Sequence, residues 1–164
     1  MIPTEGTILV IEHELEGAMA WSKRHAIPLL WLPGALELRA AFTQPETNEQ
    51  FFLKATFPDY KELPPLITFT SNDWQQPPTK SLFPKPLPGS PPWGSYVFIQ
   101  HAGKPVICVP FNRLAYGQLA GPHVDWRDPA QWQTVAPQHV RAVEIADMLQ
   151  VMARDIGCTK GRME

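Results

Sequence analysis

A cysteine stands in a short apolar stretch that is bounded by prolines. Cys108 belongs to the segment GKPVICVP, residues 103–110. A cysteine in an apolar run is often a small core residue. Pro105 and Pro110, however, make the segment a poor central strand and favour an irregular segment, on which a thiol can face solvent. Cys108 is therefore the first candidate nucleophile, and its thiolate would need hydrogen-bond donors or positive charge nearby.

Several polar residues near Cys108 in the sequence could assist such a nucleophile. His101 precedes it by seven residues and could act as a base, or it could be a solvent-exposed turn residue. His123 and Asp125 are two positions apart, so an extended backbone would place imidazole and carboxylate on one face; alternatively, the loop is merely polar. The remaining candidates are Gln100, Asn112 and Asp128. A single cysteine with a distant histidine is by itself a weak signature.

The sequence gives little support for metal or cofactor chemistry. The histidines and cysteines are scattered, and no pair has the spacing of a zinc site. No glycine-rich phosphate loop follows a strand and opens a helix. We therefore expect no metal and no cofactor. The second cysteine, Cys158, lies in the C-terminal stretch GCTKGR and is expected to be an exposed, non-essential thiol.

Hydrophobic periodicity predicts the elements that must position these residues. Residues 4–25 have the apolar spacing of an amphipathic helix that Thr4 or Thr7 can cap, with Glu12, Glu14 and Glu16 mostly on its solvated side. Four extended runs with short connections follow at residues 29–32, 36–43, 51–57 and 66–70, which favours an antiparallel meander. A closing helix is predicted to begin with Pro137 in its first turn, to bury an apolar stripe from Val140 onward, and to run to about Ile156, with Gly157 as its stop. This order is that of an α+β fold.

The segment between the meander and Cys108 is rich in proline. Residues 58–92 hold more than half of the chain's 19 prolines, interleaved with large apolar side chains such as Phe83. Aromatic side chains at that density usually pack, which favours a long loop laid over the sheet. The alternative is that residues 75–92 form a proline-rich peptide ligand for another domain.

Composition limits the classes of function. A length of 164 residues predicts a single domain over 1–164. The net charge of −2 provides no global basic field for nucleic acid, and no apolar run is long enough for a membrane helix. The start lacks the basic region of a signal peptide, and two cysteines do not make a disulfide scaffold. We therefore expect a cytoplasmic protein with reduced thiols, and neither nucleic acid nor membrane as a partner.

Two stretches resemble the ubiquitin-conjugating enzyme family. Residues 57–69, FPDYKELPPLITF, are similar to the family's proline-containing stretch between the third and fourth strands, and residues 103–109 are similar to its active-site cysteine segment. Trp126 or Trp132 resembles the tryptophan that follows the cysteine. The resemblance covers about residues 4–156. It implies an N-terminal helix, a four-stranded antiparallel meander, a long proline-rich segment leading to Cys108, and a closing helix.

The chain departs from the eukaryotic members in one motif. They carry His-Pro-Asn shortly before the cysteine, where this chain has Phe98-Ile99-Gln100 followed by His101. The loop over residues 112–137 is also longer than the common pattern. These departures resemble the divergent bacterial conjugating enzymes, found in operons with an activating enzyme, a ubiquitin-like protein and a deubiquitinase-like peptidase, some of them antiviral defence systems.

The resemblance implies a thioester relay through Cys108. Cys108 would accept a ubiquitin-like protein from an activating enzyme, docked by the N-terminal helix, and would pass it to an amine of a target protein. The candidates for stabilising the oxyanion are Gln100, Asn112 and His101, and those for taking the amine proton are Asp125, Asp128 and His123. Three alternatives remain: a catalytically inactive adaptor of the same fold, a cysteine hydrolase that uses Cys108 with His123 and Asp125, and an interaction domain that presents its proline-rich stretch.

Overall fold

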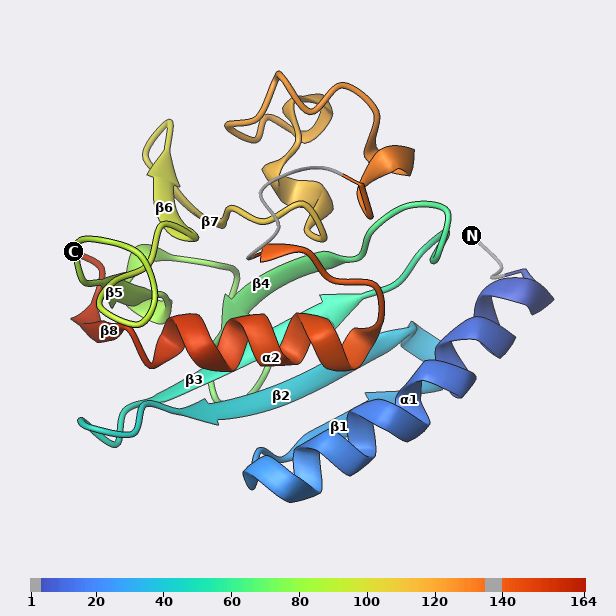
Figure 1. Ribbon diagram of the computed structural model, residues 1–164, viewed down its shortest axis with the longest axis horizontal. Coiled ribbons are helices and arrows are strands. Elements are labelled where there is room, and N and C mark those ends of the chain that lie inside the picture. The colour runs from blue at the N-terminus through green and yellow to red at the C-terminus, as the bar shows by residue number, and fades with distance from the viewer. Residues whose placement is uncertain (1–3, 135–139) are drawn as a thin grey trace.

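The fold is built on a four-stranded antiparallel sheet with a helix at each end of the chain (Figure 1). The computed structural model describes residues 4–134 and 140–164. The sheet has the order β1-β2-β3-β4, formed by β1 (Leu29–Leu32), β2 (Glu37–Thr43), β3 (Gln50–Thr56) and β4 (Leu66–Thr70). The predicted α+β class and the predicted meander are confirmed, because each strand pairs with its neighbour in sequence.

One face of this sheet forms the core. Leu38 pairs with Ala55, and Ala55 pairs in turn with Ile67, so the three side chains lie in one row across the strands. All three are buried. The closing helix α2 (Ile145–Ile156) runs across this face and packs Met148 and other apolar side chains against it (Figure 1). The alternation seen in the sequence therefore distinguishes the core face from the outer face.

The N-terminal helix α1 (Glu5–His25) has nearly the predicted bounds. The Thr4 hydroxyl caps it by accepting a hydrogen bond from the N–H of Thr7. One prediction for this helix is wrong, because Glu14 is buried rather than solvated. Its carboxylate accepts hydrogen bonds from the Tyr60 hydroxyl at 2.8 Å and from the N–H of Ile145 at 3.0 Å. The first helix, the segment after β3 and the start of α2 thus meet at one carboxylate.

The C-terminal segment also differs from the prediction. Helix α2 begins at Ile145, so Val140 and Val143 of the predicted apolar stripe precede it, and Pro137 lies outside the described residues. After Gly157, which ends the helix as predicted, β8 (Thr159–Arg162) pairs with β5 (Pro84–Pro86). The expectation of an exposed Cys158 is therefore wrong: this pairing buries Cys158, and its side chain is only 4% exposed.

The proline-rich segment is packed against the sheet. Phe83 is buried and meets Phe69 of β4 edge-on, with ring centroids 5.1 Å apart. Beyond it a hairpin of β6 (Phe98–His101) and β7 (Lys104–Ile107) extends from the body of the molecule and leads into Cys108 (Figure 1). Within the described ranges, no helix has both the length and the apolar character needed to cross a membrane.

Candidate active site

Cys108 is the first residue after β7, and hydrogen bonds to the main chain hold this segment against the body of the protein. Its N–H donates to the carbonyl of Val97 at 2.6 Å. The buried amide of Asn112 holds the same segment from the other side. It donates to the carbonyl of Ile107 at 2.8 Å and accepts from the N–H of Ile67 in β4 at 2.9 Å. The thiol is consequently fixed at the end of the hairpin, next to the core sheet.

Helix α2 contributes to this support through a buried pair. The Ser95 hydroxyl donates to Asp155 of α2 at 2.6 Å and accepts from the N–H of Val97 at 3.2 Å. Asp155 also pairs with Arg154 at 2.7 Å. Because the Val97 carbonyl accepts from Cys108, a short path of hydrogen bonds joins the closing helix to the candidate nucleophile.

The imidazole of His123 is within hydrogen-bond distance of the Cys108 thiol. Nε2 of His123 lies 2.8 Å from Sγ of Cys108. The other ring nitrogen, Nδ1, lies 3.1 Å from Oδ1 of Asp125. The consistent proton assignment has Nδ1–H donating to the carboxylate and Sγ–H donating to Nε2. This is the order of a nucleophile, a base and a residue that orients the base.

Backbone hydrogen bonds hold the loop that presents His123. The N–H of His123 donates to the carbonyl of Ala115 at 3.0 Å, and its carbonyl accepts from the N–H of Gly117 at 3.2 Å. Gly121 lies in the loop between Gly117 and His123, where the chain turns back against Ala115. A Cβ at Gly121 would lie 2.3 Å from the carbonyl carbon of Ala115, so the close approach requires glycine.

Aromatic rings cover one side of the imidazole. The His123 ring is stacked on Trp126 with centroids 3.6 Å apart and an interplanar angle of 4°. The Trp126 ring in turn packs on the ring of Tyr116, with centroids 5.3 Å apart. The buried Tyr116 hydroxyl donates to the carbonyl of Pro110 at 2.7 Å. Of the two tryptophans that resemble the family's, Trp126 is therefore beside the site, whereas Trp132 is buried and donates to the Lys61 carbonyl.

The electrostatic environment favours a neutral thiol at rest. Burial, with a smaller contribution from the charge of Asp125, raises the pKa of the Cys108 thiol from 9.0 to about 12. Nucleophilic attack requires His123 to accept the proton as the sulfur–carbon bond forms.

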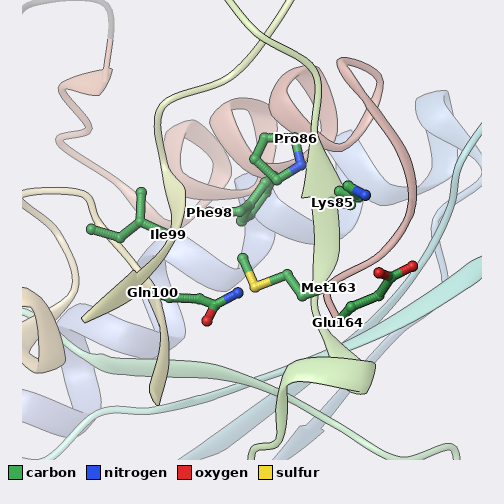
Figure 2. A pocket seen from close by; sticks show the side chains of 7 residues that line it. All are labelled: Lys85, Pro86, Phe98, Ile99, Gln100, Met163 and Glu164. Carbon is green, nitrogen blue, oxygen red and sulfur yellow. The ribbon is translucent and has the colours of Figure 1, made fainter. Parts of the chain in front are cut away.

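The other predicted site residues lie elsewhere. Gln100 and His101 are exposed at the far end of the β6–β7 hairpin. Gln100 is three residues beyond Val97, which corresponds to roughly 10 Å along a strand. Its side chain lines a different pocket, where it is directed toward Met163 (Figure 2). Asp128 caps a short 3₁₀ helix by accepting from the N–H of Ala130. The structure therefore brings Cys108, His123 and Asp125 together, but not these three.

Asn112 lies near Cys108, but its side chain hydrogen-bonds to the main chain and not to the thiol. Its oxygen accepts from the main chain of Ile67 and Leu114, and its nitrogen donates to Ile107. The side chain is fully buried. In this arrangement the amide supports the backbone under Cys108, and donation from Asn112 to a substrate oxyanion stays a prediction.

An apolar groove lies along β7, beside the loop that carries His123. It has a volume of about 450 Å³, and its walls include Val106, Leu114 and Pro122, the residue before His123. Lys104 and His101 lie at its hairpin end. The groove is lined largely by small or apolar side chains, which suits an apolar ligand rather than a compact charged one.

Comparisons with known proteins leave the site to be interpreted on its own geometry. No family model, no curated protein and no solved structure matches the chain. Two parts of the site were not predicted from the sequence: the stack of Trp126 on His123, and the Ser95–Asp155 pair. The tryptophan three residues after His123 was the available signal for the stack.

Proposed function

We propose that this protein is a ubiquitin-conjugating-type carrier that holds a ubiquitin-like protein as a thioester on Cys108. The observation that carries the proposal is the 2.8 Å contact between Cys108 Sγ and His123 Nε2. The order of the elements supports it: an N-terminal helix, a four-stranded meander, a proline-rich segment, the cysteine and a closing helix, as the resemblance implies. The groove along β7 is a suitable site for the extended end of the modifier.

The loading step needs only the groups that are present in the donor and at the site. Sγ of Cys108 attacks the thioester carbonyl that joins the modifier to a cysteine of the activating enzyme, and its proton passes to Nε2 of His123. The new sulfur–carbon bond forms as the bond to the donor cysteine breaks. The departing thiolate then takes the proton from the imidazolium. Because one thioester replaces another, the enzyme mainly has to position the reacting groups.

The transfer step uses the same proton acceptor. A neutral amine of the target attacks the carbonyl of the Cys108 thioester and gives its proton to His123. The carbon–nitrogen bond forms, the bond to Cys108 breaks, and the thiolate recovers a proton from His123. Asp125 holds the imidazole through Nδ1 in both steps.

A cysteine hydrolase is the second candidate, and one observation favours it. The series Cys108–His123–Asp125 has the connectivity of base-activated cysteine enzymes that use water as the final acceptor. The two candidates share the acylation of Cys108 and differ in what attacks the acyl group. The experiments must therefore distinguish an amine from water.

The first experiment tests the carrier with its presumed partners. The protein is incubated with ATP and with an activating enzyme and a ubiquitin-like protein encoded beside it, and the products are separated on a non-reducing gel. We expect a thiol-sensitive band heavier by one modifier, retained in Cys158→Ala and absent in Cys108→Ala. If the activating enzyme is charged but no such band forms, the carrier function is excluded.

The second experiment needs no partner enzyme. A peptide α-thioester acylates the protein, and intact mass spectrometry follows the Cys108 adduct in the presence or absence of free lysine. A carrier gives an adduct that is stable in buffer and that lysine discharges to an amide. Rapid release of the free peptide acid, unaffected by lysine, would instead establish the hydrolase. Asp125→Asn should slow acylation without changing which acceptor is used.

A further inference from the structure

We infer that Trp126 is a positioning residue that sets the plane of the His123 imidazole and stabilises it when it carries a proton. The inference depends on the proposed function in one respect: it takes Cys108 as the nucleophile and His123 as its base. Its observation is the near-parallel stack of the two rings, 3.6 Å apart and inclined by 4°. Sequence spacing alone places Trp126 near His123 but does not require this contact.

The stack restricts the freedom that Asp125 leaves to the imidazole. A single hydrogen bond from Nδ1 to Asp125 fixes one point of the ring but permits rotation about that contact. The Asp125 side chain is also 72% exposed, so it is a weakly held anchor. The flat face of the indole fixes the ring plane. Together the two contacts keep Nε2 directed at the sulfur of Cys108.

Trp126 is itself anchored to the segment that carries the nucleophile. It packs on the buried ring of Tyr116, whose hydroxyl donates to the carbonyl of Pro110, two residues after Cys108. The path from Cys108 through Pro110, Tyr116, Trp126 and His123 returns to Cys108 at the 2.8 Å contact. The base and the nucleophile are therefore held in one closed ring of contacts, although the Trp126 side chain is only partly buried.

The same stack favours the protonated state that both proposed steps produce. A cation over an indole face is attracted by the electrons of the ring. When His123 has taken a proton, the imidazolium has the Trp126 indole against its face and the Asp125 carboxylate at Nδ1 on its edge. Among the residues that the structure describes, the titratable groups that hydrogen-bond to the ring are Cys108 at Nε2 and Asp125 at Nδ1.

Two substitutions separate stacking from simple packing. Trp126→Phe keeps an aromatic face, whereas Trp126→Leu keeps apolar volume without one. The rate of Cys108 alkylation by iodoacetamide is measured by peptide mass spectrometry from pH 6 to 10, which needs no acyl donor. Trp93→Leu is the matched control, since Trp93 is 76% exposed and lies beside the turn that covers Cys158. Thermal unfolding establishes that each variant is folded.

We expect Trp126→Leu to alkylate roughly threefold more slowly near pH 7, a factor that corresponds to the usual strength of an exposed cation–aromatic contact. Its pH profile should shift toward that of His123→Ala, while Trp126→Phe stays close to the native protein. In NMR spectra of the native protein, the His123 ring protons should be moved upfield by the indole, and Trp126→Leu should abolish that shift.

Three results would overturn the inference. They are an unshifted His123 ring in the native protein, equal alkylation profiles for Trp126→Leu and the native protein, and a Phe variant as impaired as the Leu variant. If instead the stack is established but no thioester forms on Cys108 with a charged activating enzyme, the inference stands and the carrier function alone fails.

Discussion

Nε2 of His123 reaches to within 2.8 Å of the sulfur of Cys108 from a loop 15 residues further along the chain. The thiol it contacts is mostly buried, and its pKa is raised to about 12. At neutral pH such a thiol is essentially all protonated without a base. We therefore expect the reactivity of Cys108 near pH 7 to depend on His123.

His123→Ala should lower the rate of Cys108 alkylation at pH 7 by about 100-fold, the usual contribution of a positioned base. The difference should shrink as the pH rises, because hydroxide then supplies the thiolate directly. Peptide mass spectrometry measures the rate, and His13→Ala, an exposed histidine on α1, is the matched control. An unchanged rate in His123→Ala would show that the imidazole does not activate the thiol.

The raised pKa of Cys108 also predicts a loss of stability in alkali. A thiol whose pKa is higher in the folded than in the unfolded state stabilises the fold below the unfolded pKa of 9.0, and this contribution is lost as the pH rises toward about 12. At pH 10 the loss is on the order of 1 kcal/mol. Cys108→Ala should therefore lose less unfolding free energy than the native protein between pH 8 and pH 10 in urea titrations. Equal losses in the two proteins would contradict the prediction.

Glu14→Ala should destabilise the protein by about 3 kcal/mol, because it leaves the Tyr60 hydroxyl and the Ile145 N–H buried without their acceptor. Glu14→Gln keeps one acceptor oxygen and should cost less. Glu16→Ala, on the exposed side of the same helix, is the control and should change stability by less than about 0.5 kcal/mol. Urea unfolding measures all three, and similar costs for Glu14→Ala and Glu16→Ala would rule out the buried role of Glu14.

Ser95→Ala should cost about 1–3 kcal/mol, since it removes a donor from the fully buried Asp155. Because Ser95 also holds Val97, the acceptor for the N–H of Cys108, acylation of Cys108 by a peptide thioester should slow as well. Ser81→Ala is exposed and serves as the control. A destabilised variant with an unchanged acylation rate would show that the hydrogen-bond path does not position the thiol.

Gly121→Ala should impair both the fold of the loop and the chemistry at Cys108. The added Cβ would lie 2.3 Å from a backbone carbon of Ala115, so the loop must shift and carry His123 with it. We expect about 1–3 kcal/mol of destabilisation together with slower Cys108 alkylation. At Gly34 a Cβ would meet nothing within 4 Å, so Gly34→Ala should leave both measurements nearly unchanged. The same result for the two variants would contradict the close packing at Gly121.

The sequence predicts the regular elements well where periodicity and caps agree. The helix capped by Thr4 and the alternating strands are local features, since each depends on neighbours within a few residues. The burial of Glu14 and of Cys158 was not predictable in this way. Glu14 is buried because α2 and the segment after β3 meet it, and Cys158 because β8 pairs with a segment over 70 residues earlier.

In the candidate site too, local relationships were predictable from the sequence and long-range contacts were not. The spacing of His123 and Asp125 predicts that they share a face, and the structure shows their hydrogen bond. The contact of His123 with Cys108 depends on how the loop folds back over residues 115–117, which no local pattern encodes. Gln100 was considered by analogy of spacing, but a hairpin carries it away from the cysteine. Residue types therefore indicate which side chains could react, whereas only the fold decides which of these candidates lie in contact.

The Glu14 carboxylate has a consequence for the order in which the chain folds. Its bond to the N–H of Ile145 closes a loop of 131 residues. During synthesis, α1 is made before α2, so Glu14 acquires this partner only after the residues between the two helices have been made. Closing so long a loop is entropically slow compared with forming a local turn. Docking of α1 against α2 should therefore be a late event in folding. A nascent chain that stops before α2 would carry α1 without the Ile145 N–H that binds Glu14.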